Sequence, residues 1–187
     1  MAATTTTPRV VYSDCSVRAG VAVAAWYIDR KSFGAMCVAA SNSNVAETLA
    51  ALLAINSSTG SVVITTDSRV LCDSINLDPT SKAWAQAITL NPVLPELKRR
   101  IEERGASIMW AKGHGTTTPR GLKFCDILSR AVSRRASYLD LRVGDSIDCA
   151  PVHPTPSTTQ RVRVPACPSR TSPLRHLNRE IVPNLVS

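Results

Sequence analysis

The chain is 187 residues long, 44% of its residues are hydrophobic, and its formal net charge is +8. This length allows one domain with a full core plus an appendage, and it argues against two complete domains. The amino terminus shows neither the basic and apolar regions of a signal peptide nor a long apolar span, so we expect a cytoplasmic protein. The six cysteines form no CxxC pair and no ligand spacing with the three histidines, which argues against zinc and favours free thiols.

The composition changes sharply near residue 139. All eight aromatic residues lie between Tyr12 and Tyr138, whereas seven of the twelve prolines lie beyond Asp140. We therefore predict a disordered N-terminus at 1–8, a folded domain at 9–139 and a flexible Pro- and Arg-rich tail at 140–187. Most of the net positive charge falls in the folded part. This favours a polyanionic partner, although a contribution to solubility alone would produce the same charge.

The folded part shows a regular order of predicted elements. Residues 10–13, 20–28 and 33–40 are short apolar and β-branched runs that predict three antiparallel strands. Residues 44–56 predict an apolar helix, with Asn44 and Glu47 as a candidate capping box. A strand at 62–66, helices at 68–75 and 92–104, a strand at 107–111 and a helix at 119–136 follow. Because strand–helix–strand passages pair in parallel, we predict an α/β fold with a five-stranded mixed sheet flanked by helices.

Four carboxylates stand at element ends or within apolar segments, where an unpaired charge is costly to bury. They are Asp14, Glu47, Asp67 and Asp126, with Asp73 as a weaker candidate. Each also has an ordinary explanation. Asp14 could be a turn residue, Glu47 part of the capping box, Asp67 the cap of the following helix and Asp126 a solvated helix residue. A cluster of carboxylates suits Mg²⁺, with Mn²⁺ as an alternative, and two such ions would support hydrolysis of a phosphodiester.

The order of short motifs adds a second line of argument. Ser13-Asp-Cys-Ser, Ala46-Glu-Thr-Leu-Ala, Thr65-Thr-Asp-Ser, Trp110-Ala-Lys-Gly-His and Cys125-Asp-Ile-Leu-Ser-Arg follow one another along the chain. Over residues 9–137 this series resembles the ribonuclease H family, in its type 1 form. The family usually has Gly where Cys15 stands, and residues 115–122 lack its usual acidic and Asn-containing stretch.

The resemblance implies a metal-dependent endoribonuclease that cuts the RNA strand of RNA·DNA hybrids. It assigns the metal ligands to Asp14, Glu47, Asp67 and Asp126, and it assigns a role in proton transfer or product release to His114. Such enzymes identify RNA by its 2′-hydroxyls and the duplex by its shape and phosphates. Candidate substrate contacts are Ser16, Asn44, Lys82, Trp84, Lys98, Arg99, Arg100, Lys112 and Lys123. For 98–100 a solvated helix face is an equal alternative.

Other functions remain open at this stage. An exonuclease or junction resolvase can use the same fold and the same acidic cluster, and a nucleic-acid-binding module can keep the fold without catalysis. We expect a monomer that does not bind membranes. The tail is a candidate tether to a replication or reverse-transcription partner.

Overall fold

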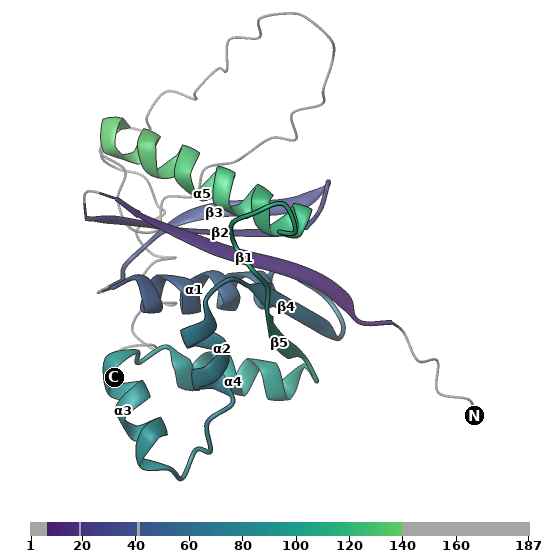
Figure 1. The fold of residues 1–187 in the computed structure, drawn as a ribbon, viewed down its shortest axis with the longest axis vertical. Helices are drawn as coiled ribbons and strands as arrows, with labels where there is room; N and C mark the ends of the chain where they lie inside the picture. Colours follow the sequence, from purple (N-terminus) through teal and green to yellow (C-terminus); the bar gives the residue numbers. More distant parts are fainter. Residues whose placement is uncertain (1–6, 19, 41, 140–187) are drawn as a thin grey trace, which may run out of the picture. The chain divides into compact units, whose positions relative to one another are not determined.

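The computed structural model describes residues 7–18, 20–40 and 42–139, with side chains as far as residue 135 (Figure 1). Most of the N-terminus predicted to be disordered, and the predicted tail, lie outside the described residues. The strands are β1 (Arg9–Arg18), β2 (Val21–Asp29), β3 (Ser32–Val38), β4 (Val62–Thr66) and β5 (Ser107–Trp110). The helices are α1 (Ser43–Asn56), α2 (Arg69–Ile75), α3 (Lys82–Leu90), α4 (Leu94–Glu103) and α5 (Arg120–Leu139).

The five strands form one mixed sheet in the order β3-β2-β1-β4-β5. The first three strands pair antiparallel as consecutive hairpins, and β4 pairs parallel with both β1 and β5. This arrangement confirms the predicted sheet. It also places β1 and β4 next to each other at the centre, although α1 separates them in sequence.

Helices cover both faces of the sheet, with α5 on one side and α1 on the other (Figure 1). In β2 the residues from Ala22 to Ala25 are all buried, as expected for a strand that is covered on both faces. Val23 and Ala25 pack in one core cluster with Cys125 and Val132 of α5. Because side chains alternate along a strand, the intervening residues Ala22 and Ala24 point to the face that α1 covers.

The helix α3 was not predicted, because residues 76–91 were interpreted as a polar connection. Its N-cap is Ser81, whose side chain accepts a hydrogen bond from the Trp84 N–H at 3.1 Å. Trp84 is the one buried residue of the helix, at 8% exposure. The cap at Ser81 and the helical spacing of Trp84, Ala87 and Ile88 are sequence signals for this helix that the prediction did not use.

Strand β1 is longer than predicted. It was expected to end before Asp14, but it continues to Arg18 because the antiparallel pairing with β2 extends as far as Val21.

Among the described residues, no helix has the length and apolar character needed to cross a membrane.

Candidate active site

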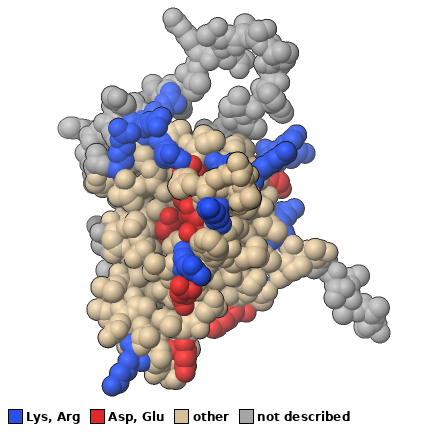
Figure 2. All heavy atoms as spheres, viewed as in Figure 1, with Lys and Arg blue, Asp and Glu red and all other residues tan. Residues whose placement is uncertain are grey.

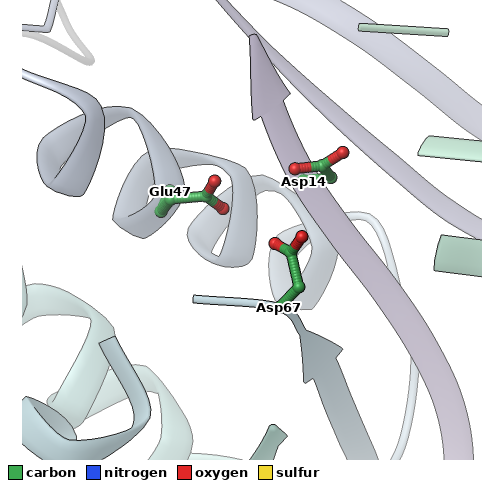
Figure 3. A group of neighbouring side chains, drawn as sticks. All are labelled: Asp14, Glu47 and Asp67. Atoms are coloured by element: carbon green, nitrogen blue, oxygen red, sulfur yellow. The ribbon is translucent and has the colours of Figure 1, made fainter. Parts of the chain in front are cut away.

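Three carboxylates meet where β1 and β4 lie side by side. Asp14 lies in the middle of β1, Glu47 lies in α1, and Asp67 directly follows β4. One carboxylate oxygen from each of the three lies within 4.8 Å of the others (Figure 3). The parallel register brings the two aspartates level, because Tyr12 pairs with Thr65 and each aspartate stands two residues further on. We call these three residues the carboxylate group.

The ordinary explanations for these residues do not match the local structure. Asp14 is paired within a strand and is not a turn residue. The N-cap of α1 is Asn42, whose side chain accepts from the Val45 N–H at 3.0 Å, so the predicted capping box of Asn44 and Glu47 is wrong. The N-cap of α2 is Ser68, which leaves Asp67 outside that role.

Burial makes the carboxylate group difficult to ionise. Asp14 is 6% exposed, and its burial, together with the nearby charge of Asp67, raises its pKa to about 7. The Cys15 N–H, which donates to Asp14 Oδ1 at 2.8 Å, and the charge of Arg130 oppose that rise. Burial and the charge of Asp14 raise the pKa of Glu47 to about 8. Without a positive charge beside them, Asp14 and Glu47 are therefore difficult to ionise together near neutral pH.

Cys15 forms a hydrogen bond with one carboxylate oxygen of Glu47. Its Sγ lies 3.2 Å from Glu47 Oε1, and burial, together with the charge of Glu47, raises the pKa of the thiol. Cys15 is therefore a neutral donor to the carboxylate. The other oxygen, Glu47 Oε2, is buried and has no hydrogen-bond partner among the residues that the structure describes.

These features fit a hard divalent cation. Carboxylate oxygens are the ligands that Mg²⁺ prefers, and the unpartnered Glu47 Oε2 offers such an oxygen inside the group. A bound cation would also offset the repulsion that raises the pKa values of Asp14 and Glu47. The donor set therefore fits the predicted metal, and Asp14, Glu47 and Asp67 are the residues that could hold it.

The loop between β5 and α5 lies directly against the carboxylate group. Trp110 Nε1 donates to the backbone oxygen of Asp67 at 3.0 Å. Gly113 approaches so closely that a Cβ at this position would lie 1.8 Å from Asp67 Oδ2. The Thr118 hydroxyl donates to the Gly113 carbonyl at 3.0 Å, which closes the base of the loop. This geometry explains the glycine of the Lys-Gly-His motif, whose contact with Asp67 the sequence interpretation missed.

The predicted residues His114 and Lys112 flank Gly113, and both are exposed. His114 is therefore one residue away from the contact with Asp67, with its imidazole accessible to solvent. A histidine in this position is available for proton transfer at the edge of the site.

Asp126, the fourth predicted ligand, is not part of the carboxylate group. Its side chain is 21% exposed and forms an ion pair with Arg130, one turn later in α5. Arg130 also lowers the pKa of Asp14, so it lies close enough to act on both aspartates. The sequence interpretation overlooked Arg130, although its spacing of four residues from Asp126 is typical of a helical ion pair.

The basic residues predicted on α4 have other partners. Lys98 Nζ donates to the carbonyl oxygens of Ile75 and Leu77 at 2.7 and 3.2 Å and lies 5.3 Å from the centre of the Trp84 ring. Trp84, predicted as a substrate contact, is 8% exposed and packs beneath Lys98. Arg99 and Arg100 form ion pairs with acidic residues of the same helix, as expected for a solvated helix face.

The remaining candidate substrate contacts are distributed over several elements. Ser16 lies in β1 beyond Asp14 and is partly buried. The exposed candidates are Asn44 in α1, Lys82 in α3 and Lys123 in α5. Figure 2 shows a patch of acidic atoms near the middle of one face, with separate basic side chains around it.

Comparison with known proteins identifies the family. The model of the family described as RNase H matches residues 6–134. The chain belongs to the ribonuclease H family. The domain is therefore a nuclease domain of the ribonuclease H fold, and the resemblance stated from its motifs is confirmed.

A solved structure shares this fold, and a second is reported beside it. The N-terminal RNase H domain of Rv2228c from Mycobacterium tuberculosis superposes with a TM-score of 0.50 at 10% identity, over 71% of this chain and 97% of that one. RNase H1 from the halophilic archaeon Halobacterium salinarum gives a TM-score of 0.48 at 18% identity, over 68% of this chain and 98% of that one. No curated protein sequence matches the chain.

Proposed function

We propose that this ribonuclease H domain hydrolyses the RNA strand of RNA·DNA hybrids with the help of two divalent cations, most suitably Mg²⁺. The observation behind the proposal is the carboxylate group, with its three oxygens within 4.8 Å of one another. Membership of the family supports phosphodiester hydrolysis, and the hard oxygen donors support a metal-dependent reaction.

The residues of the chain divide the work in this proposal. Asp14, Glu47 and Asp67 would hold the metal, and Asp126, which forms an ion pair with Arg130, would be the fourth ligand. When bound, the cations make water a stronger nucleophile and offset the charge that develops on the leaving oxygen. Exposed on the loop beside Asp67, His114 transfers a proton or assists release of the product.

Recognition of the substrate needs both strands. The RNA strand is distinguished by its 2′-hydroxyl groups, which a polar residue beside the site can contact, and Ser16 and Asn44 are the candidates. Lys112 and Lys123, both exposed, are the candidates for phosphate contacts. Contacts of this kind read no base edges, so we expect weak sequence preference.

The decisive experiment compares the wild-type protein with Asp67→Asn on labelled RNA·DNA hybrid, duplex RNA, duplex DNA and single strands, in Mg²⁺, in Mn²⁺ and in chelator. Asp73→Asn is the matched control, because Asp73 is an exposed carboxylate in α2, only six residues further along the chain. We expect cleavage of the RNA in the hybrid alone, with loss of cleavage in chelator and in Asp67→Asn but not in Asp73→Asn.

Other outcomes would direct the assignment elsewhere. Cleavage of DNA ends or junctions would make the domain another nuclease of the same fold. Binding without cleavage in either metal would make it a nucleic-acid-binding module, and the proposal would be wrong.

A further inference from the structure

The exposed side of α5 carries a row of basic side chains. Residues three or four positions apart in a helix lie on one face, and positions 120, 123, 127, 130 and 134 of α5 have this spacing. All five are exposed, and four of them are basic. We call these four residues the α5 stripe: Arg120, Lys123, Arg130 and Arg134.

Packing fixes the direction of the α5 stripe. On the opposite side of the helix, Leu122, Cys125 and Val132 are buried. Aromatic contacts also fix this helix against the sheet, because the Phe124 ring lies 5.0 Å from the rings of both Tyr27 and Phe33. The helix therefore cannot rotate its basic side chains inward, and the α5 stripe faces solvent.

The α5 stripe also passes beside the carboxylate group. Cys125 Sγ donates to the Tyr12 carbonyl oxygen at 3.5 Å, and the Ser133 hydroxyl donates to the Ser16 carbonyl oxygen at 3.4 Å. The part of α5 that carries Arg130 therefore runs along the part of β1 that carries Asp14. Arg120 and Lys123 lie on one side of Arg130 along the helix, and Arg134 lies on the other. A polyanion that follows α5 would therefore pass the place where the proposed cleavage occurs.

The positive charge of α5 has little internal compensation. Asp126 is the one acidic residue of the helix, and it pairs with Arg130. In α4, by contrast, Arg99 and Arg100 pair with Glu96 and Glu103. Compared with α4, α5 therefore keeps more of its positive charge available to attract phosphates.

We propose that the α5 stripe binds the sugar–phosphate backbone of the duplex on both sides of the cleavage site. This inference rests on the proposed function only in taking the same RNA·DNA hybrid as ligand. From Arg120 to Arg134 the helix rises about 21 Å, at roughly 1.5 Å per residue. That length matches about six base pairs at roughly 3.4 Å per nucleotide. Cations at both ends and in the middle of a helix of this length can contact several phosphates of one strand.

The composition of the same face argues against a membrane partner. Ile127, 67% exposed, is the one large apolar side chain between the basic residues of the stripe. A helix that lies in a membrane interface needs a broad apolar face next to its basic one. The apolar face of α5 is already buried against the sheet.

The test compares two double variants that remove the same charge. Arg120→Gln with Arg134→Gln neutralises the two ends of the α5 stripe and leaves Arg130 and the carboxylate group unchanged. Arg99→Gln with Arg100→Gln is the matched control on α4. Both are made in the Asp67→Asn background with chelator to prevent cleavage, and circular dichroism checks that each is folded. Fluorescence anisotropy then measures the dissociation constant for a 20-base-pair RNA·DNA hybrid between 50 and 200 mM salt.

Each phosphate contact contributes about 0.9 to the slope of log affinity against log salt, so the α5 double variant should lose about 2 from this slope. It should also bind at least tenfold more weakly at the lowest salt. The α4 control should keep the parent slope. Equal slopes in the two double variants would overturn the inference, as would a loss of binding to acidic phospholipid vesicles with no change for the hybrid.

The proposed function is tested separately, by cleavage with the wild-type protein. A hybrid that binds through the α5 stripe but is not cleaved would leave this inference standing and remove the proposed function. If the hybrid is cleaved and the α5 double variant leaves the salt slope unchanged, the proposed function stands and this inference is wrong.

Discussion

Replacing Asp14 with Asn should stabilise the metal-free protein while it removes the activity. The Asp14 carboxyl is 6% exposed, and its burial and the charge of Asp67 raise its pKa from 3.8 to about 7. The folded protein therefore holds the Asp14 proton more tightly than the unfolded chain does. Because of this, the wild-type protein loses stability as the pH rises from the unfolded pKa, near 4, to the folded pKa, near 7.

The size of the effect follows from this shift. The pKa of Asp14 differs by about three units between the folded and unfolded states. At about 1.4 kcal/mol per unit, this lowers the free energy of unfolding of the wild-type protein by about 4 kcal/mol at pH 8. By the same linkage, the loss in the free energy of unfolding is about 2 kcal/mol at pH 5 and below 1 kcal/mol at pH 4. Asn removes the charge and keeps an oxygen that can accept the Cys15 N–H, now bonded at 2.8 Å. The advantage of the variant should therefore grow with pH.

Urea denaturation in chelator, repeated between pH 4 and pH 8, measures this difference directly. Asp73→Asn serves as the control, because it removes an exposed carboxylate and should show no such growth with pH. Added Mg²⁺ should stabilise the wild-type protein by mass action and leave Asp14→Asn nearly unchanged. The reasoning is refuted if Asp14→Asn is less stable than the wild type at pH 8, or if the difference between them does not depend on pH.

Three further substitutions test other contacts. In Gly113→Ala the new Cβ would lie 1.8 Å from Asp67 Oδ2, so the Asp67 carboxylate must be displaced. The rate of cleavage should then fall about a hundredfold, while the melting temperature stays nearly unchanged. An unchanged kcat would show that the loop moves instead of the carboxylate. Gly121→Ala places a Cβ 2.1 Å from the Tyr12 ring and should cost about 1–3 kcal/mol in urea denaturation. A neutral result would mean that the ring moves aside. Lys98→Met loses two hydrogen bonds to backbone carbonyls and should cost about 1–3 kcal/mol without changing the salt dependence of hybrid binding. A changed salt slope would return Lys98 to the substrate surface.

Much of the fold can be predicted from local sequence. Residues 62–66 form a strand because they are an uninterrupted apolar and β-branched run, and 44–56 form a helix because helix formers follow one another without a break. The parallel pairing of β4 then follows from the helix that precedes it. The helix α3 was missed, although the cap at Ser81 and the spacing of Trp84, Ala87 and Ile88 indicate a helix. The packing of Trp84 beneath Lys98 of another helix depends on the tertiary structure.

The sequence by itself determined the family and the identity of the acidic residues. The order of Asp14, Glu47 and Asp67, each beside a characteristic element, is a property of the chain and needs no structure to be read. Local pattern also identified the Trp-Ala-Lys-Gly-His segment as part of the site, though not the reason for its glycine.

Only the tertiary structure decided how these residues act on one another. The register of β1 against β4 brings Asp14 level with Asp67, and burial by distant elements raises the pKa of Asp14 and of Glu47. The structure also pairs Asp126 with Arg130. Contact distance, burial and charge compensation depend on residues far apart in the chain, and a local pattern holds no information about which distant groups will meet.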